Sequence, residues 1–230
     1  MTRPISGLVI FDCDGVLVDS EPISLRCTTA ALNRFGYPVD EDDVFDRFLG
    51  SSTASMVAAV EAGLGRGLAP EALDDLRREI LDAFGRELKA VPGVARAAER
   101  LDRPFCVASS SIPERIRYSL RITGLLPLFE PDIFSATMVV HGKPAPDLFL
   151  LAAKRMKAEP SRCIVVEDSI HGAKAGKAAG MTVLGFIGGS HIRGNAARER
   201  SHGEKLTQAG AAMVFDRLAD LPELVREFSH

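Results

Sequence analysis

Two aspartates placed one residue apart, directly after a short apolar run, constrain this chain more than any other feature. The run Gly7–Phe11 reads GLVIF, and Asp12-Cys13-Asp14-Gly15 follows it. An apolar run of this length closed by a glycine turn is typical of a buried strand, so both acids would emerge at the strand's carboxyl end, where open α/β sheets bind ligands. Adjacent carboxylates destabilise each other unless a cation compensates them or their environments give them different roles. The same letters also fit a simple strand-ending turn, and this motif alone does not decide between the two interpretations.

Further polar clusters occur where other strands are expected to end. Ser109-Ser110-Ser111 closes one apolar run, Glu167-Asp168-Ser169 closes another, and Lys143 lies in the loop HGKPAPD ahead of a helical pattern. If these strands are parallel neighbours, the clusters meet at one edge of the sheet. Four carboxylates, a hydroxyl and an ammonium group gathered in one crevice suit phosphate chemistry.

The order of strand and helix patterns predicts the fold class and the domain organisation. From Gly93 onward strand and helix candidates alternate, which predicts an α/β fold, a Rossmann-like doubly wound parallel sheet with helices on both faces. The region between Glu21 and Lys89 shows only helical patterns and is expected to be an inserted all-α domain. We place the core at 1–17 and 88–230 and the insertion at 18–87. The segment 188–210, rich in Gly, Arg and Ser, is expected to be a loop.

Taken together and in this order, the motifs resemble the haloacid dehalogenase superfamily, specifically its phosphatase branch with a small helical (C1-type) cap inserted after the first strand. The matching letters are DCDGVLVDSE from Asp12, the serine Ser109, GKPAPD from Gly142, and EDS from Glu167. The resemblance spans about residues 5 to 190, and the joint occurrence of four motifs is far more specific than any one of them. It implies a central strand order of 3-2-1-4-5.

The resemblance also implies a role for each polar residue of the core. Asp12 would attack phosphorus and form an aspartyl-phosphate, which splits one difficult displacement into two steps. Asp14 would protonate the leaving oxygen and then take a proton from the hydrolytic water. Lys143 and Ser109 would stabilise the transferring oxygens, and backbone amides near Ser110 would add donors.

A divalent cation is expected between the attacking carboxylate and the phosphate, since these two anions repel each other. Mg²⁺ fits because it prefers oxygen ligands in octahedral geometry. By resemblance its ligands would be the Asp12 carboxylate, the Asp14 backbone carbonyl and the Asp168 carboxylate, with Glu167 acting through a bound water.

Some neighbours of these motifs have simpler interpretations. The letters from Ser111 to Glu114 are typical of a capping box that opens a helix, so that capping is the expected main role of Ser110 and Ser111. His141 and His171 lie near motif residues but are interpreted as ordinary loop and helix-start residues. His191 and His202 lie in the expected loop and are given no role.

Single positions separate the enzyme activities of the superfamily. Asp14 argues against a dehalogenase, because a halide leaving group needs no proton and relatives with that activity lack the second aspartate. Ser24 stands where hexose-phosphate mutases carry a cap-hinge histidine, and Leu49 and Thr53 lie where those mutases carry cations nearby. Hydrolysis is therefore favoured over mutase chemistry, which remains the main alternative. The candidate substrate-binding residues of the cap are Arg47, Gly50, Ser51 and Ser52.

Three non-enzymatic classes remain as hypotheses. A phospho-accepting receiver domain shares the acidic pair and the Lys-Pro dipeptide but occupies about half this length. A calcium loop would require Glu where Ile23 stands. A catalytically silent binding module is the third, although no motif position suggests loss of chemistry.

Composition limits the partners and the compartment. The 230 residues carry a formal net charge of −3, which gives no basic footprint for nucleic acid or an anionic membrane. No apolar stretch approaches the ~20 residues of a membrane span, and the first strand begins too early for a signal peptide, so we expect a cytoplasmic protein. The four cysteines match neither a zinc site nor a disulfide framework and are expected to be reduced. The expected partner is a small phosphorylated metabolite, and the expected state is a monomer or a weak homodimer.

Overall fold

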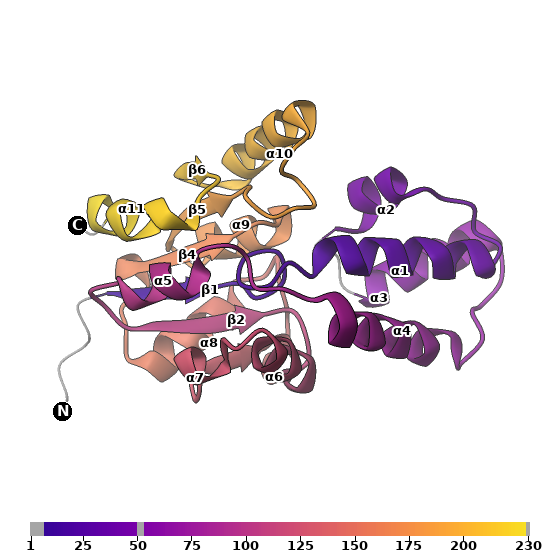
Figure 1. The fold of residues 1–230 in the computed structure, drawn as a ribbon, viewed down its shortest axis with the longest axis horizontal. Helices are drawn as coiled ribbons and strands as arrows, with labels where there is room; N and C mark the ends of the chain where they lie inside the picture. Colours follow the sequence, from indigo (N-terminus) through magenta and orange to yellow (C-terminus); the bar gives the residue numbers. More distant parts are fainter. Residues whose placement is uncertain (1–6, 50–52, 229–230) are drawn as a thin grey trace. The chain divides into compact units, whose positions relative to one another are not determined.

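The computed structural model describes residues 7–49 and 53–228 and divides the chain into two compact units (Figure 1). The core unit comprises Met1–Asp19 with Lys89–His230, and the helical unit comprises Ser20–Leu88. Within the core unit the two crossings of the chain are paired, since Asp19 N donates to Lys89 O and Val91 N donates to Leu17 O, both at 2.9 Å. The core unit therefore holds the start and the end of the insertion side by side.

A six-stranded parallel sheet forms the centre of the core unit, in the order β3-β2-β1-β4-β5-β6. This confirms the predicted doubly wound α/β fold and its central order, and it adds β6 at one edge. The strands are β1 (Leu8–Phe11), β2 (Phe105–Ser109), β3 (Ile133–Ser135), β4 (Cys163–Glu167), β5 (Thr182–Phe186) and β6 (Met213–Phe215).

Burial on both faces explains why the central strands are continuous apolar runs rather than alternating ones. All four residues of β1 are buried. Leu8 and Ile10 join a core cluster with side chains of the helices on one face, whereas the ring of Phe11 packs edge-on against Phe105 and Phe129. At the edge of the sheet, β6 has the pattern exposed, intermediate, buried, as expected for a strand with one neighbour.

Helices cover both faces of this sheet (Figure 1). The α-helices of the core unit are α5 (Val94–Glu99), α6 (Pro113–Ile122), α7 (Leu126–Phe129), α8 (Asp147–Met156), α9 (Ile170–Ala178), α10 (Ala196–Ala209) and α11 (Leu221–Glu227). Short 3-10 turns lie at Ala136–Met138, Pro160–Arg162 and Leu218–Asp220.

The expectation that 188–210 is a loop is wrong for its second half, which forms α10. The Asn195 side chain accepts bonds from the backbone nitrogens of Ala197 and Arg198, at 3.1 and 3.0 Å, and so caps the helix. The buried side chains of α10 are His202, Leu206 and Ala209. Their spacing is helical, but a histidine and an alanine occupy two of the three buried positions, so the apolar signal in the sequence is weak.

The helical unit consists of α1 (Glu21–Arg34), α2 (Glu41–Phe48), α3 (Thr53–Leu64) and α4 (Ala72–Glu87) among the described residues. Helix α4 buries Leu76, Ile80 and Phe84, one residue per turn, and α1 packs against it. Helix α2 begins with a capping box in which Asp40 and Asp43 each accept the other's backbone N–H. In the described part of the chain, none of the helices combines the length and apolar character that crossing a bilayer would require.

Candidate active site

Three acids meet where two neighbouring strands end. Asp12 follows β1 and Glu167 ends β4, and the two strands are in parallel register, with Phe11 opposite Val166. Asp12 N donates to Val166 O at 2.9 Å, which continues the ladder past the last residue of β1. Asp12, Glu167 and Asp168 are buried, and each offers a carboxylate oxygen within 4.8 Å of the others. The parallel sheet therefore brings together acids that lie more than 150 positions apart.

Lys143 supplies the positive charge of this cluster. Its Nζ lies 2.6 Å from Asp12 Oδ1 and 2.5 Å from Glu167 Oε1, and its side chain is 2% exposed. Nζ also lies 4.8 Å from the centroid of the Phe149 ring. Burial lowers the pKa of Lys143, but the carboxylates of Asp12 and Glu167 outweigh burial, so this pKa is raised and the ammonium stays charged.

The acids themselves are short of compensating charge. Burial raises the pKa of Asp12 well above its ordinary value; Lys143 opposes this, and the neighbouring carboxylates add to it. Burial likewise raises the pKa of Asp168, and the Glu167 carboxylate is the next largest cause. One ammonium thus faces three carboxylates. A hard divalent cation fits this donor set, because its oxygen ligands are already gathered and its charge would offset the remaining repulsion.

Close backbone contacts fix the orientation of two of these acids. Glu167 Oε2 accepts bonds from Ser169 N at 2.8 Å and Ser169 Oγ at 2.9 Å. A β-carbon at Gly172 would overlap the Glu167 carboxylate, and one at Gly15 would overlap the Asp168 carboxylate. Gly15 also has a φ of +81°, which residues with side chains rarely adopt. The glycine after Asp14 therefore serves both the turn and the room that Asp168 requires.

Asp14 lies in a different environment from Asp12. Its Oδ2 accepts a bond from Ser111 Oγ at 2.7 Å, and its Oδ1 lies 3.1 Å from the guanidinium of Arg115. The predicted capping box at Ser111 is wrong, since Ile112 is the N-cap of α6 and no side-chain capping bond forms. The Ser111 hydroxyl is directed to Asp14 instead of to the helix.

The two other serines of this segment differ in exposure. Ser109 is buried at the end of β2, and its Oγ accepts a bond from Ser111 N at 3.1 Å. Ser110 is exposed. Because β2 pairs with β1, Ser109 at the end of β2 lies beside the chain that continues from β1 into Asp12.

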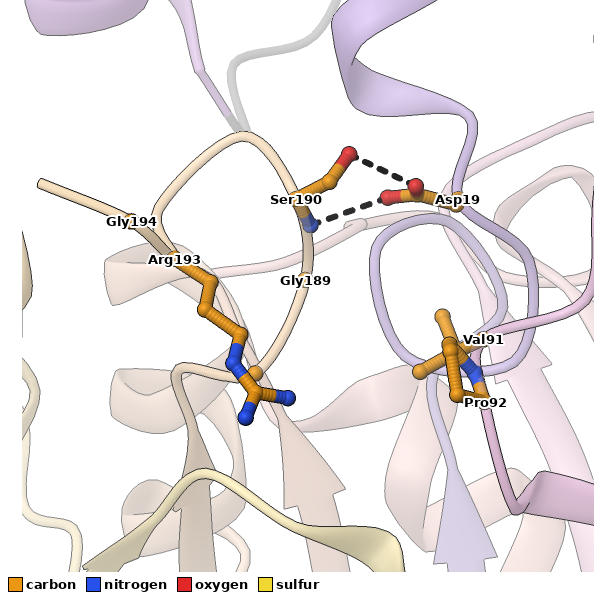
Figure 2. A pocket seen from close by; sticks show the side chains of 8 residues that line it. Asp19, Val91, Pro92, Gly189, Ser190, Arg193 and Gly194 are labelled. Atoms are coloured by element: carbon orange, nitrogen blue, oxygen red, sulfur yellow. Dashed lines mark hydrogen bonds between the residues drawn. The ribbon is translucent and has the colours of Figure 1, made fainter.

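A separate hollow of about 230 Å³ lies beside the crossings of the core unit (Figure 2). Asp19 forms one side of it, where its carboxylate accepts bonds from Ser190 N at 3.0 Å and Ser190 Oγ at 2.6 Å. None of the acids of the cluster lines it; its lining residues are Asp19, Val91, Pro92, Gly188, Gly189, Ser190, Arg193 and Gly194. The candidate reaction centre is therefore the acidic cluster and not this hollow.

Comparison with known proteins assigns the family. The family model of haloacid dehalogenase-like hydrolases matches residues 7–180, and a related HAD-hydrolase-like model matches residues 140–221. The chain belongs to the haloacid dehalogenase-like hydrolases. Over 217 residues it is 35% identical to 6-phosphogluconate phosphatase of Escherichia coli (strain K12), covering 94% of this chain and 93% of the relative, which confirms the phosphatase branch and an enzymatic role.

Two solved structures support the same assignment. A conserved haloacid dehalogenase-like protein of unknown function from Agrobacterium tumefaciens str. C58 is 38% identical, covers 97% of this chain and 99% of its own, and superposes with a TM-score of 0.84. A HAD family hydrolase from Deinococcus radiodurans R1, solved with bound phosphate and sodium, is 31% identical, with coverages of 99% and 97% and a TM-score of 0.76.

In this haloacid dehalogenase-like hydrolase, the structure also places at the site polar residues that no sequence motif singles out. Ser111 and Arg115 hold Asp14, as described above. His191 and His202, which lie in the segment expected to be a loop, are both buried beside Asp168. His191 lies in the loop after β5 and His202 lies on α10. Recognising α10 in the sequence would have placed His202 on the buried face of a helix, and this is the signal that could have drawn attention to the segment.

Of the four substrate-binding residues predicted in the helical unit, the structure describes Arg47 alone. Arg47 is exposed, donates a hydrogen bond to the Tyr37 hydroxyl, and stacks its guanidinium 5.3 Å from the Tyr37 ring centroid and 5.1 Å from that of Phe48. The other three candidates, Gly50, Ser51 and Ser52, lie outside the described residues.

Proposed function

We propose that this chain is a Mg²⁺-dependent phosphomonoester hydrolase that acts through an aspartyl-phosphate on Asp12. The observation that carries this proposal is the buried convergence of Asp12, Glu167 and Asp168 around the Lys143 ammonium. Acids that serve only to keep a surface solvated would be exposed, whereas these three are buried. A buried cluster with an attached ammonium is the arrangement that binding and cleaving a phosphate dianion requires.

The two aspartates of the first motif have separate roles in this proposal. Asp12 attacks phosphorus, and Asp14 protonates the departing ester oxygen; Asp14 then takes a proton from the water that hydrolyses the acyl phosphate. Lys143 and Ser109 stabilise the oxygens of the transferring group. The environments of the two acids support this division, because Asp12 is paired with a lysine whereas Asp14 is held by Ser111 and Arg115.

A bound Mg²⁺ would neutralise charge between the nucleophile and the phosphate. The carboxylates of Asp12 and Asp168 and the backbone carbonyl of Asp14 would hold it, with Glu167 in support through a water molecule. The oxygen-only donor set of the cluster favours Mg²⁺ over softer transition metals.

The substrate in this proposal is a small phosphorylated metabolite, either a sugar phosphate, a sugar-acid phosphate or phosphoglycolate. The relative that acts on 6-phosphogluconate supports the sugar-acid class, because the match covers nearly all of both chains. Arg47, with Gly50, Ser51 and Ser52, is the proposed source of substrate contacts in the helical unit. The proposal needs neither nucleic acid nor a membrane as a partner, and it is compatible with a monomer or a weak homodimer in the cytoplasm.

A hexose-phosphate mutase is the second candidate function, favoured by the shared cap architecture and opposed by Ser24. Ser24 is the fourth residue of α1, and its backbone N–H donates to Ser20 O. The mutases that the motifs resemble carry a histidine at this hinge, and a serine hydroxyl does not supply a group that titrates near neutral pH.

The test is phosphate release from a panel of sugar phosphates, sugar-acid phosphates and phosphoglycolate at saturating Mg²⁺, with p-nitrophenyl phosphate as the generic substrate. We expect Mg²⁺-dependent release that chelation with EDTA abolishes and that the Asp12→Asn variant lacks. Conversion of a hexose 1-phosphate into its 6-phosphate without phosphate release would favour the mutase. Absence of both activities would leave a binding module and refute the proposal.

A further inference from the structure

Asp168 is held from two sides by histidines that belong to the segment after β5. Nε2 of His191 lies 3.1 Å from Asp168 Oδ2, with the His191 side chain 0% exposed. Nε2 of His202 on α10 lies 2.6 Å from the backbone oxygen of Asp168. The backbone carbonyl oxygen only accepts hydrogen bonds, so Nε2 of His202 carries the hydrogen in its contact with Asp168. His191 Nε2 and the Asp168 carboxylate are in close polar contact without the alignment of a hydrogen bond.

The loop that carries His191 is itself tied down on both sides of this residue. On one side, Ser190 donates two hydrogen bonds to Asp19 (Figure 2). On the other side, the guanidinium of Arg198 donates to the backbone oxygen of His191 at 3.0 Å. Within the loop, Ile192 N and Arg193 N both donate to Gly189 O. The imidazole is therefore presented by a fixed turn.

Glycines make the room in which the imidazole and the carboxylate meet. A β-carbon on Gly189 would come within 2.6 Å of His191 Cε1 and 3.0 Å of Gly15 O. One on Gly15 would overlap Asp168 and lie 3.2 Å from His191 Cε1. The loop after β5, the first motif and Asp168 are thus packed in direct contact, and the imidazole fills the space behind the carboxylate.

We propose that His191 is a positioning residue that fixes the Asp168 carboxylate by its Oδ2 and so leaves the other oxygen for the catalytic cation. This inference rests on the proposed function, which makes Asp168 a metal ligand. Mg²⁺ demands near-ideal octahedral geometry, so a ligand carboxylate that can rotate binds it less well. Residues behind the ligands that hold them in orientation typically change metal affinity or activity by about 10- to 100-fold when they are replaced. His202, on α10, fixes the backbone of Asp168.

The test measures Mg²⁺ binding to the substrate-free protein by isothermal titration calorimetry, and therefore does not depend on turnover. His191→Leu keeps much of the volume but removes the polar contact, whereas His191→Gln keeps an amide donor close to the position of Nε2. We expect the Leu variant to bind Mg²⁺ about 10- to 100-fold more weakly and the Gln variant to recover most of that loss. Raising the Mg²⁺ concentration should restore phosphate release by the Leu variant.

Controls separate positioning from folding. His141→Leu also removes an imidazole, but one whose side chain is 72% exposed, and it should leave Mg²⁺ affinity unchanged. The Leu and Gln variants of His191 should share the same metal-free melting temperature. If His191→Leu does not fold, His191→Asn replaces it, because its shorter amide does not reach Oδ2.

Two results would overturn the inference while leaving the proposed function intact. One is equal Mg²⁺ affinity in the unaltered protein and the Leu variant, together with normal phosphate release. The other is an equal loss of affinity in the Leu and Gln variants that follows an equal fall in metal-free melting temperature, which would indicate a packing role only. If the unaltered protein neither binds Mg²⁺ nor releases phosphate, the proposed function itself fails and the inference fails with it.

Discussion

Lys143 and Glu167 of the core unit meet at 2.5 Å with side chains that are 2% and 0% exposed, whereas Arg34 and Glu79 of the helical unit meet at 2.6 Å with side chains that are 51% and 43% exposed. The two contacts have nearly the same length but different surroundings. Burial makes the first pair sensitive to the loss of either partner, because the remaining charge would be left buried without compensation. Water screens the second pair, so the loss of either partner matters little. The core unit therefore concentrates the chemistry, and the charged pairs of the helical unit have a modest structural role.

Removing the proposed nucleophile, Asp12, tests the core side of this contrast most severely. Asp12→Asn should lower kcat by at least about 10⁴-fold, since loss of a nucleophile removes the covalent route itself. The same change should leave the fold intact and stabilise the metal-free protein, because it relieves repulsion among buried acids. Steady-state phosphate release and thermal unfolding in EDTA measure the two effects. Near-normal turnover would contradict the role of Asp12.

The contacts of Asp14 should have the next largest effect. Arg115→Ala and Ser111→Ala each remove one contact of the Asp14 carboxylate. If Asp14 is the acid–base group, as proposed, its misplacement should lower kcat by up to about 100-fold. Arg117→Ala is the matched control, because Arg117 also lies on α6 but its side chain is 35% exposed and pairs with Glu130 at 2.9 Å. Equal kcat values for the Arg115 and Arg117 variants would show that Asp14 needs no such support.

These residues also show how far the sequence predicts the site. The meeting of Asp12, Glu167 and Asp168 could be predicted because each lies at a strand end, and parallel strands bring their carboxyl ends together. Lys143 lies in a loop and was predicted only from its place in the ordered set of motifs. The contact of Ser111 with Asp14 could not be predicted, since a serine before a helix has a more common use as a cap.

The fold follows the same division. The central strands were predictable because burial on both faces leaves continuous apolar runs. Helix α10 was missed because only Leu206 gives a strong apolar signal among its buried residues. His202 is buried there for its contact with Asp168, which no local pattern reveals. Likewise, the loop at 188–194 resembles any glycine-rich loop until His191 is seen beside an acid.

Stability as a function of pH should distinguish the buried acids from the exposed ones. In the absence of a cation, burial raises the pKa values of Asp12 and Asp168, so the folded state binds more protons than the unfolded state above pH ~4. Stability from these groups is present at low pH and is lost as the pH rises towards the folded-state pKa values. Lys143, whose pKa is raised, stays charged throughout and adds no slope near neutrality.

Mg²⁺ should therefore raise the melting temperature more at pH 8 than at pH 5.5, because the cation offsets a repulsion that grows as the acids ionise. Differential scanning fluorimetry with Mg²⁺ and with EDTA across this pH range gives the comparison. In Asp12→Asn the pH slope measured in EDTA should be shallower. An increment independent of pH in the unaltered protein would show that the acids are already ionised without the cation.

The smallest effect is expected at the ion pair between α1 and α4. Arg34 donates to both oxygens of Glu79, at 2.6 and 2.7 Å, yet about half of each side chain is exposed. Exposed pairs typically contribute about 0.2–1 kcal/mol, so Arg34→Ala should lower the free energy of unfolding by no more than this and leave kcat on p-nitrophenyl phosphate unchanged. A double-mutant cycle with Glu79→Ala isolates the coupling energy of the Arg34–Glu79 pair. Arg26→Ala, which removes a second pair between α1 and α4 at 2.8 Å, supplies the matched control. A coupling energy of several kcal/mol would place this pair with Lys143 and Glu167, and the difference between the two units would then reflect something other than solvent screening.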